Sequence, residues 1–299
     1  MNFSSWAYRE EPIERLVLLR MVVPLAVLGF MSSRLVHADH WIGDAGFCLP
    51  NLHGDWRQPM YFAPLAPPLA WALATMMVLA GLGMSVGLFF RTSSAIFAAT
   101  LVYVALADRL SAFTVSKISP VIVLALLGSG AGSAYSVDAW RARARKVTLT
   151  RPERVGTIRF LQAFLCAFYC ASGVAKMRGD WLSRGDVLWT QLGDSYQTQF
   201  SYTLANTLPG FAWTALQGAT LAFEVLAPLW LSWSRSRPFA LVYGIVMHAM
   251  IGAMFWPVRW FALLMMTLLV GAFMPQSSLE RFFAWLARWR SRPAAVQST

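Results

Sequence analysis

The sequence FLQAFLCAFYCASGVAKMRGDWL, residues 160–182, begins with thirteen residues that carry no charge. A run of this kind is typical of a membrane-spanning helix. Lys176 stands where the apolar run ends, and Trp181 follows five positions later. The stretch therefore predicts a membrane helix with an ionisable side chain close to one of its ends.

Similar apolar runs recur along the chain of 299 residues, of which 57% are hydrophobic and 13% are charged. A soluble domain usually carries about 25% charged residues. Eight runs are long enough, or nearly so, to cross a hydrocarbon core of about 30 Å at about 1.5 Å per residue. They are residues 16–33, 67–90, 94–107, 118–134, 159–176, 209–233, 238–256 and 258–275. We expect an all-α fold, a single polytopic transmembrane helical bundle of about eight spans over residues 1–299.

Four basic segments fall on one side of this bundle: Arg91, residues 140–159, residues 235–237 and an amphipathic tail at residues 277–299. Basic connections face the cytoplasm in membrane proteins, so both termini are expected there. The net charge of +11 then indicates contact with anionic membrane lipid. Nucleic acid is not expected as a partner, because the arginines lie beside the spans.

The span of residues 159–176 carries its polar groups on one face. At about 100° per residue, this face holds Lys176, Gly173, Ser172, Tyr169, Leu165 and Gln162. Two interpretations of Lys176 are open. The lysine caps the helix and extends into the outer interface, or it turns inward, where a desolvated amine can act as a general base.

Two further ionisable residues are expected within the membrane. Glu224 lies eleven residues before Arg235, and His248 lies eleven residues after Arg237, so both are about 16 Å from the same boundary. Buried charges in a membrane need a partner or a cavity. We expect a hydrogen bond between Glu224 and His248, which either belongs to a site or pins two helices together.

Other polar residues give weaker signals. His37 and His40 stand beside Asp39, but loop histidines are more often solvated than bound to metal, so no metal is expected. Asp138 is expected to cap a short helix that follows it.

The string FYCASGVAKMRGDWLSRG, residues 168–185, resembles the Tyr-x(3)-Gly-x(2)-Lys-x(4)-Trp-x(3)-Gly segment of vitamin K-dependent gamma-glutamyl carboxylases and their bacterial relatives with the horizontally transferred transmembrane (HTTM) domain. Four more stretches fit the family in order. They are GLFFRTS (87–93), YSVD (135–138), FEVLAPLWL (223–231) and HAMIGAMFWPVRWFALLM (248–265). The five stretches lie between residues 87 and 265, and the resemblance as a whole covers residues 12 to 280.

The resemblance implies a chemistry. In the carboxylases the lysine deprotonates a reduced quinone, oxygen adds, an epoxide forms, and the resulting base removes a proton from a peptide glutamate, to which carbon dioxide adds. At matching positions this implies Lys176 as the base and His248 as a second catalytic residue, with Glu224 beside them. It also implies a reduced quinone as cofactor, whether vitamin K hydroquinone, menaquinol or ubiquinol, and oxygen and carbon dioxide as co-substrates.

We expect the quinone to contact residues around the helix end and the aromatic side chains that can exclude water. These are Tyr169, Ser172, Gly173, Trp181 and Trp256, with Trp260 as a further wall. The sequence departs from the family at one position, where Lys117 stands in place of a histidine of the carboxylases.

The carboxylases continue into a large extramembranous domain, whereas this sequence ends soon after its last span. We therefore expect a partner protein to deliver the substrate, as in the membrane proteins of bacterial peptide-toxin maturation systems, which this sequence resembles. The expected protein is a multi-pass enzyme of the bacterial inner membrane that modifies a peptide or small molecule on the outer face. One alternative is a non-catalytic membrane partner, carrier, or immunity or export component; another is a quinone-binding redox subunit resembling the DoxX type.

Overall fold

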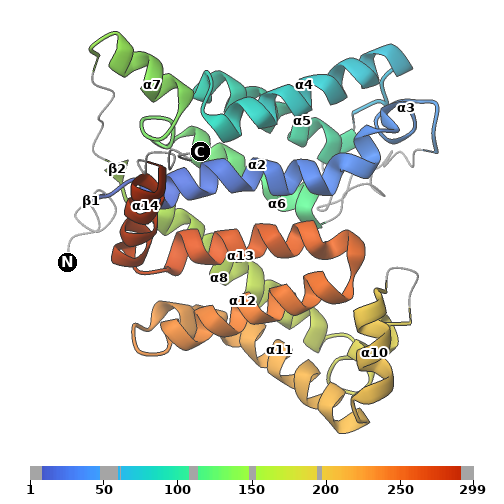
Figure 1. Ribbon diagram of the computed structural model, residues 1–299. Coiled ribbons are helices and arrows are strands. Elements are labelled where there is room, and N and C mark those ends of the chain that lie inside the picture. Colours follow the sequence, from blue (N-terminus) through green and yellow to red (C-terminus); the bar gives the residue numbers. More distant parts are fainter. Residues whose placement is uncertain are drawn as a thin grey trace, which may run out of the picture.

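The computed structural model describes residues 9–47, 60, 62–107, 114–147, 153–193 and 197–290. Long helices dominate these residues and run side by side (Figure 1). Seven helical segments are long and apolar enough to cross a membrane. They are α2 (Glu14–Leu35), α4 (Pro67–Val86), α5 (Phe90–Ala107), α8 (Gly156–Met177), α11 (Gly210–Ser232), α12 (Arg237–Met254), and η1 (Trp256–Val258) continued by α13 (Arg259–Phe273). The expected all-α polytopic bundle is confirmed.

The eighth expected span differs most from its prediction. Residues 118–134 were expected as a helix, but α6 (Thr114–Leu127) begins earlier and ends before Gly128, and its 14 residues fall short of a full crossing. Glycines at 128, 130 and 132 follow it, and glycine favours the end of a helix over its continuation. The third expected span, residues 94–107, begins four residues earlier than predicted, at Phe90.

The remaining elements are short or peripheral. Five helices connect or flank the spans: α3 (Ala38–Trp41), α7 (Val137–Ala144), α9 (Val187–Gln191), α10 (Gln199–Thr207) and α14 (Gln276–Arg290). Strands β1 (Glu10–Glu11) and β2 (Glu153–Arg154) pair antiparallel and join the segments that precede α2 and α8. Residues 277–290 of the expected basic tail belong to α14 and are helical, and residues 291–299 lie outside the described residues.

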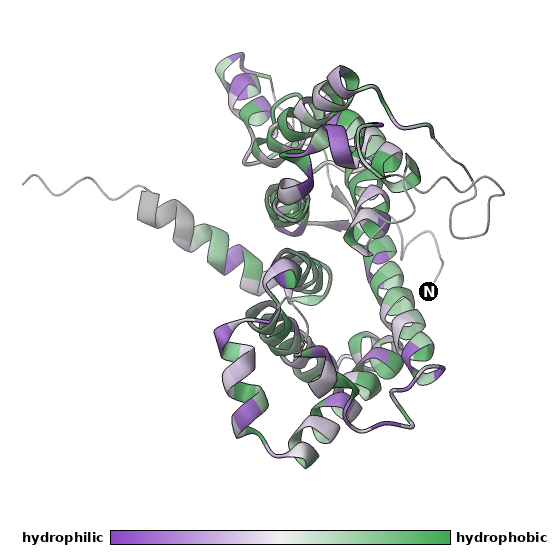
Figure 2. Ribbon diagram, turned by 90° about the vertical axis from the view of Figure 1, so that its right-hand side faces the viewer, coloured by the Kyte–Doolittle hydropathy of each residue, from purple (hydrophilic) through white to green (hydrophobic). Residues whose placement is uncertain are grey.

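The centre of the bundle is the pair α2 and α13 (Figure 1). Helix α2 packs against α4, and α4 against α5, while α13 packs against α12 and α8. Hydrophobic residues extend along the long helices, and hydrophilic residues gather in the connections and short helices (Figure 2). Large apolar side chains such as Leu79, Leu229 and Phe239 are exposed on the outside, which is the arrangement expected where lipid replaces water around the chain.

A polar network joins α2 to the loop between α6 and α7. Arg20 is fully buried in α2 and donates to the carbonyl oxygens of Ala131, Ala134 and Tyr135 at 3.1, 3.0 and 2.5 Å. These bonds hold the loop against the core. They also offset part of the cost of burying the guanidinium, whose Nε has no partner among the described residues.

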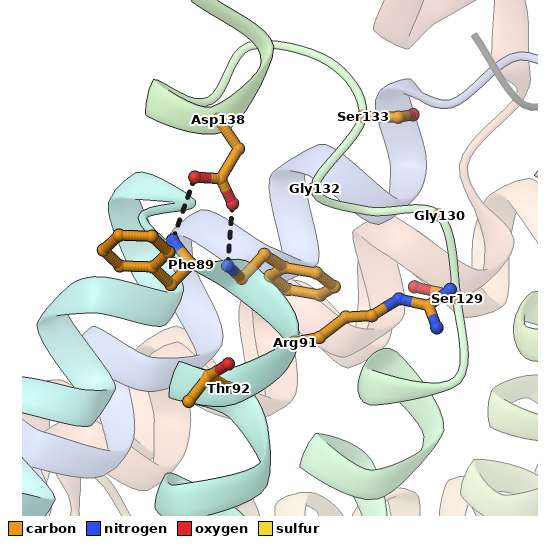
Figure 3. Close-up of a pocket in the computed structure, with 9 residues that line it drawn as sticks. Phe89, Arg91, Thr92, Ser129, Gly130, Gly132, Ser133 and Asp138 are labelled. Atoms are coloured by element: carbon orange, nitrogen blue, oxygen red, sulfur yellow. Dashed lines mark hydrogen bonds between the residues drawn. The ribbon is translucent and has the colours of Figure 1, made fainter. Parts of the chain in front are cut away.

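The expected role of Asp138 as cap of the following helix is wrong. Ser136 caps α7 instead, because its hydroxyl accepts from the amide of Ala139 at 2.9 Å. The Asp138 carboxylate reaches across to α5 and accepts from the amides of Phe89 and Phe90 at 2.9 and 2.8 Å (Figure 3). A carboxylate stabilises the first turn of a helix, which explains why α5 begins at Phe90.

Candidate functional site

Helices α8 and α11 approach closely at Gly173. A Cβ at this position would lie 2.7 Å from Val225 Cγ2 and 2.8 Å from the Val225 backbone nitrogen. Only glycine allows this separation without a shift of the backbone. The approach brings the last turn of α8, which carries Lys176, beside Glu224 in the middle of α11.

Lys176 and Glu224 form the central pair of the site. The ammonium of Lys176 donates to Glu224 Oε1. The Glu224 side chain is 9% exposed and the Lys176 side chain is 26% exposed. An ion pair this far from water is stable only with good geometry on both sides. Lys176 is therefore directed toward the neighbouring helix.

Trp181 covers the other side of the lysine. The Lys176 ammonium lies 4.9 Å from the centroid of the Trp181 ring, within the range of a cation–π interaction. The Trp181 backbone is in turn fixed by Gln217 of α11. The Gln217 amide nitrogen donates to the carbonyl oxygens of Trp181 and Arg184 at 2.8 and 2.6 Å, and its oxygen accepts from the amide of Leu188 at 3.1 Å.

Gln217 was not among the predicted site residues. It lies seven residues before Glu224 and therefore on the same face of α11. Gln217 could have been identified from the sequence, because it is a polar amide within an apolar span and shares a helix face with the Glu224 carboxylate; in the structure it is buried.

The loop that carries Trp181 is also closed by an ion pair. Arg184 Nε lies 3.1 Å from Asp186 Oδ1. The hydrogen bond from Arg184 lowers the pKa of the Asp186 carboxyl below its ordinary value, and the same bond raises the pKa of Arg184. Both groups are exposed, so this pair orders the loop more than it stabilises the fold.

Tyr169 and His248 form a second buried pair. The Tyr169 hydroxyl lies 2.7 Å from His248 Nε2. Tyr169 is two helical turns before Lys176 on the same face of α8, and its ring meets Phe223, the neighbour of Glu224, edge-on at 5.3 Å. The two polar pairs are thus adjacent along the contact between α8 and α11.

The expected hydrogen bond between Glu224 and His248 is wrong. Glu224 bonds Lys176, and His248 bonds Tyr169. The residue count placed Glu224 and His248 at the same depth on α11 and α12 and so suggested that they pair. The count took no account of α8, which packs against α11 and supplies a partner for each residue.

Two buried atoms of the site have no hydrogen-bond partner within the described part of the chain: Glu224 Oε2 and His248 Nδ1. A buried polar atom without a partner costs about 1–3 kcal/mol. An unpaired buried polar atom calls for an explanation, such as a catalytic role or a bound water or ion. Both belong to the predicted site residues.

The other predicted residues are distributed unequally. Ser172 is half-buried on α8 between Tyr169 and Lys176. Trp256 is 61% exposed in η1, and the Arg259 guanidinium lies 3.6 Å from its ring centroid. Trp260 packs on α2 at Gly29, and Lys117 is exposed on α6. The structure thus brings together Lys176, Glu224, Tyr169, His248, Gly173 and Trp181.

Residues 8–276 match the family model of the HTTM domain, so the chain belongs to the HTTM-domain family. The resemblance expected from the five stretches is confirmed, and the chain is a multi-pass membrane protein related to the carboxylase family. No curated protein and no solved structure matches the chain.

Proposed function

We propose that this HTTM-domain protein is an integral membrane enzyme that uses a reduced quinone and oxygen, with Lys176 as the base that takes a proton from a quinol hydroxyl. The observation that carries the proposal is the direction of the Lys176 side chain, whose amine bonds the buried carboxylate of Glu224 beneath Trp181. A lysine that only reached for water would extend beyond the helix end. This lysine extends toward a neighbouring helix, as a base in a closed site does.

Glu224 is the partner that a base inside a membrane needs. An amine accepts a proton only when it is neutral. The Lys176 ammonium can pass its proton to Glu224 Oε1, because the pair stays neutral overall when it does so. When the amine then takes a second proton, the pair carries one positive charge. That charge stabilises the negative charge which deprotonation creates on the substrate side.

Two features of the site support a quinol as the ligand. Glu224 Oε2 and His248 Nδ1 are buried without partners, and the rings of Tyr169, Phe223 and Phe261 lie around them. A flat ring with hydroxyl groups offers polar partners to the two atoms and apolar surface to the rings. When bound, vitamin K hydroquinone, menaquinol or ubiquinol would supply the electrons for the reaction with oxygen, and carbon dioxide is a further co-substrate.

We place the site on the outer side of the bacterial inner membrane. Lys176 lies in the last turn of α8, whereas α8 begins just after the arginine-rich connection. The positive-inside rule supports a cytoplasmic position for that connection and for both termini. A peptide or small molecule, delivered by a partner protein, would then reach the site from outside.

The test is quinol oxidation by the purified protein in lipid nanodiscs, supplied with each of the three reduced quinones, bicarbonate and oxygen. Quinone epoxide is measured by chromatography. We expect product from the wild type and none from Lys176→Ala or Lys176→Arg. Arginine keeps the charge that pairs with Glu224, but it does not give up its proton, so Lys176→Arg separates the charge from the base.

Lys146→Arg is the matched control, because Lys146 is exposed and lies after α7, at the arginine-rich end. Its activity should equal that of the wild type. Epoxide formed by Lys176→Arg at the wild-type rate would contradict the proposal, as would folded wild-type protein that forms no epoxide with any of the three quinols.

The second candidate is a non-catalytic membrane partner, carrier, or immunity or export component. The close approach of α8 and α11 at Gly173 favours it, since a lysine and a carboxylate can also clamp two helices together. In that case Lys176→Arg leaves every property of the protein close to that of the wild type, and no quinol is consumed.

A further inference from the structure

A cavity of about 340 Å³ opens at the arginine-rich end of the bundle, far along the chain from the Lys176 site (Figure 3). It lies between the first turn of α5 and the loop that joins α6 to α7. The lining consists of Phe89, Phe90, Arg91, Thr92, Ser129, Gly130, Gly132, Ser133 and Asp138.

Arg91 is the uncompensated charge of this cavity. Its side chain extends from α5 toward Ser129 (Figure 3), and no hydrogen bond or ion pair engages its guanidinium among the described residues. The Asp138 carboxylate is already occupied by the amides of Phe89 and Phe90 and lies in the field of the buried Arg20. Arg91 and Asp138 both line the cavity, but the Asp138 oxygens are used by α5, so the Arg91 guanidinium is available to an external anion.

A second hollow continues the first along the membrane-facing surface. It is a groove of about 780 Å³ between α4 and α5, and it shares Phe89 and Thr92 with the cavity. The other lining residues are Ala72, Thr75, Met76, Leu79, Ala80, Ser93 and Ile96.

The groove is more apolar than its composition suggests. The hydroxyl of Thr75 donates to the carbonyl oxygen of Trp71 at 2.9 Å, and that of Ser93 to Leu88 at 2.7 Å. Both hydroxyls thus bond to backbone carbonyl oxygens, one in α4 and one in the turn before α5. Leu79 is 65% exposed along it.

Phe89 lies at the junction of the two hollows in an unusual conformation. Its backbone has a φ of 44°, and its side chain is 64% exposed. A bulky residue other than glycine rarely adopts positive φ, and such strain often marks a binding or switching position. The turn holds the ring between the polar cavity and the apolar groove.

We propose that the cavity and the groove together bind one anionic phospholipid. The headgroup phosphate pairs with Arg91 in the cavity, and an acyl chain lies in the groove between α4 and α5. A positive group directly beside an apolar channel matches the two halves of such a lipid. Arg141, whose guanidinium lies 5.3 Å from the centroid of the Phe89 ring, adds positive charge near the mouth. The inference does not depend on the proposed function.

The test uses the full chain, purified in mild detergent, and native mass spectrometry during titration with phosphatidylglycerol or with phosphatidylcholine of the same acyl chains. We expect tighter binding of phosphatidylglycerol, and Arg91→Gln should weaken it about fivefold, the effect of one basic contact at a membrane surface. Arg91→Lys should retain most of the affinity. Arg235→Gln is the control, because Arg235 is an exposed arginine between α11 and α12.

Ala72→Trp tests the groove separately. Ala72 is exposed on α4, so the larger side chain fills the groove without disturbing the core, and we expect it to weaken phosphatidylglycerol binding. Equal binding of the two lipids would overturn the proposal, as would equal effects of Arg91→Gln and Arg235→Gln. If inorganic phosphate alone stabilises the protein as much as phosphatidylglycerol does, and Ala72→Trp changes neither effect, the cavity is a phosphate site and the lipid proposal fails.

Discussion

Replacing Gly173 by alanine tests the contact between α8 and α11 on which the candidate site depends. The added Cβ would lie 2.7 Å from Val225 Cγ2, 2.8 Å from the Val225 backbone nitrogen and 3.1 Å from Glu224 Cβ. Rotation of a side chain cannot relieve the contact with the backbone nitrogen, so the two helices have to move apart. Overpacking of this kind costs roughly 1–3 kcal/mol.

Gly218→Ala is the matched control for this substitution. Gly218 lies on α11, and a Cβ there meets nothing within 4 Å. Both variants gain the same helix propensity, about 1 kcal/mol, so the difference between them isolates the clash. We expect the free energy of unfolding of Gly173→Ala to be lower than that of Gly218→Ala by roughly 1–3 kcal/mol. Unfolding is followed by circular dichroism as a denaturing detergent is added.

The same movement draws Lys176 away from Glu224. Because a displacement of about 1 Å can reduce catalysis about 100-fold, the quinol assay should show a much larger loss for Gly173→Ala than for Gly218→Ala. Equal stability and equal activity of the two variants would refute the argument that the close approach of these helices positions the pair.

Two further substitutions test the surroundings of the site and the start of α5. Gln217→Leu removes three hydrogen bonds to the loop that carries Trp181. Amide hydrogen exchange at residues 181–188 should therefore become faster, while exchange in α7 stays the same. Unchanged exchange at residues 181–188 would show that Gln217 does not hold the loop. Asp138→Ala removes the carboxylate that caps α5 and should lower the free energy of unfolding by about 1 kcal/mol. Asp180→Ala, at an exposed loop residue, is the control and should leave the free energy of unfolding unchanged. Equal stability of the two variants would contradict the capping role of Asp138.

The spans could be predicted from sequence because hydropathy records burial in lipid directly. Their ends could not, since these depend on contacts between distant residues. Helix α5 begins at Phe90 because Asp138, 48 residues later, accepts from its first amides. Nothing in the local sequence around residue 90 reveals that cap. The end of α6 at Leu127 could be predicted better from the local sequence, because glycines follow it.

Several residues that the structure brings together were named from the sequence, but neither their pairing nor Gln217 was. Lys176 was identifiable because the polar residues of its helix lie on the same face as the lysine, and Glu224 and His248 because ionisable groups within spans are costly. Depth along each helix follows from counting residues at about 1.5 Å each. The partner of each side chain also depends on how each helix is rotated about its axis and on which helices are neighbours. A residue count gives no information on either.

The observed pairing also explains how a carboxylate is tolerated in the middle of α11. Glu224 needs a positive partner at its depth, and His248 is bonded to Tyr169 instead. Lys176 lies at the end of α8, but its four methylene groups let the amine reach back to the carboxylate while Trp181 covers it from outside. The lysine side chain stays 26% exposed, against 9% for Glu224. Under the proposed function, this gradient favours a pair in which the amine faces the incoming substrate and the carboxylate receives the proton on the buried side.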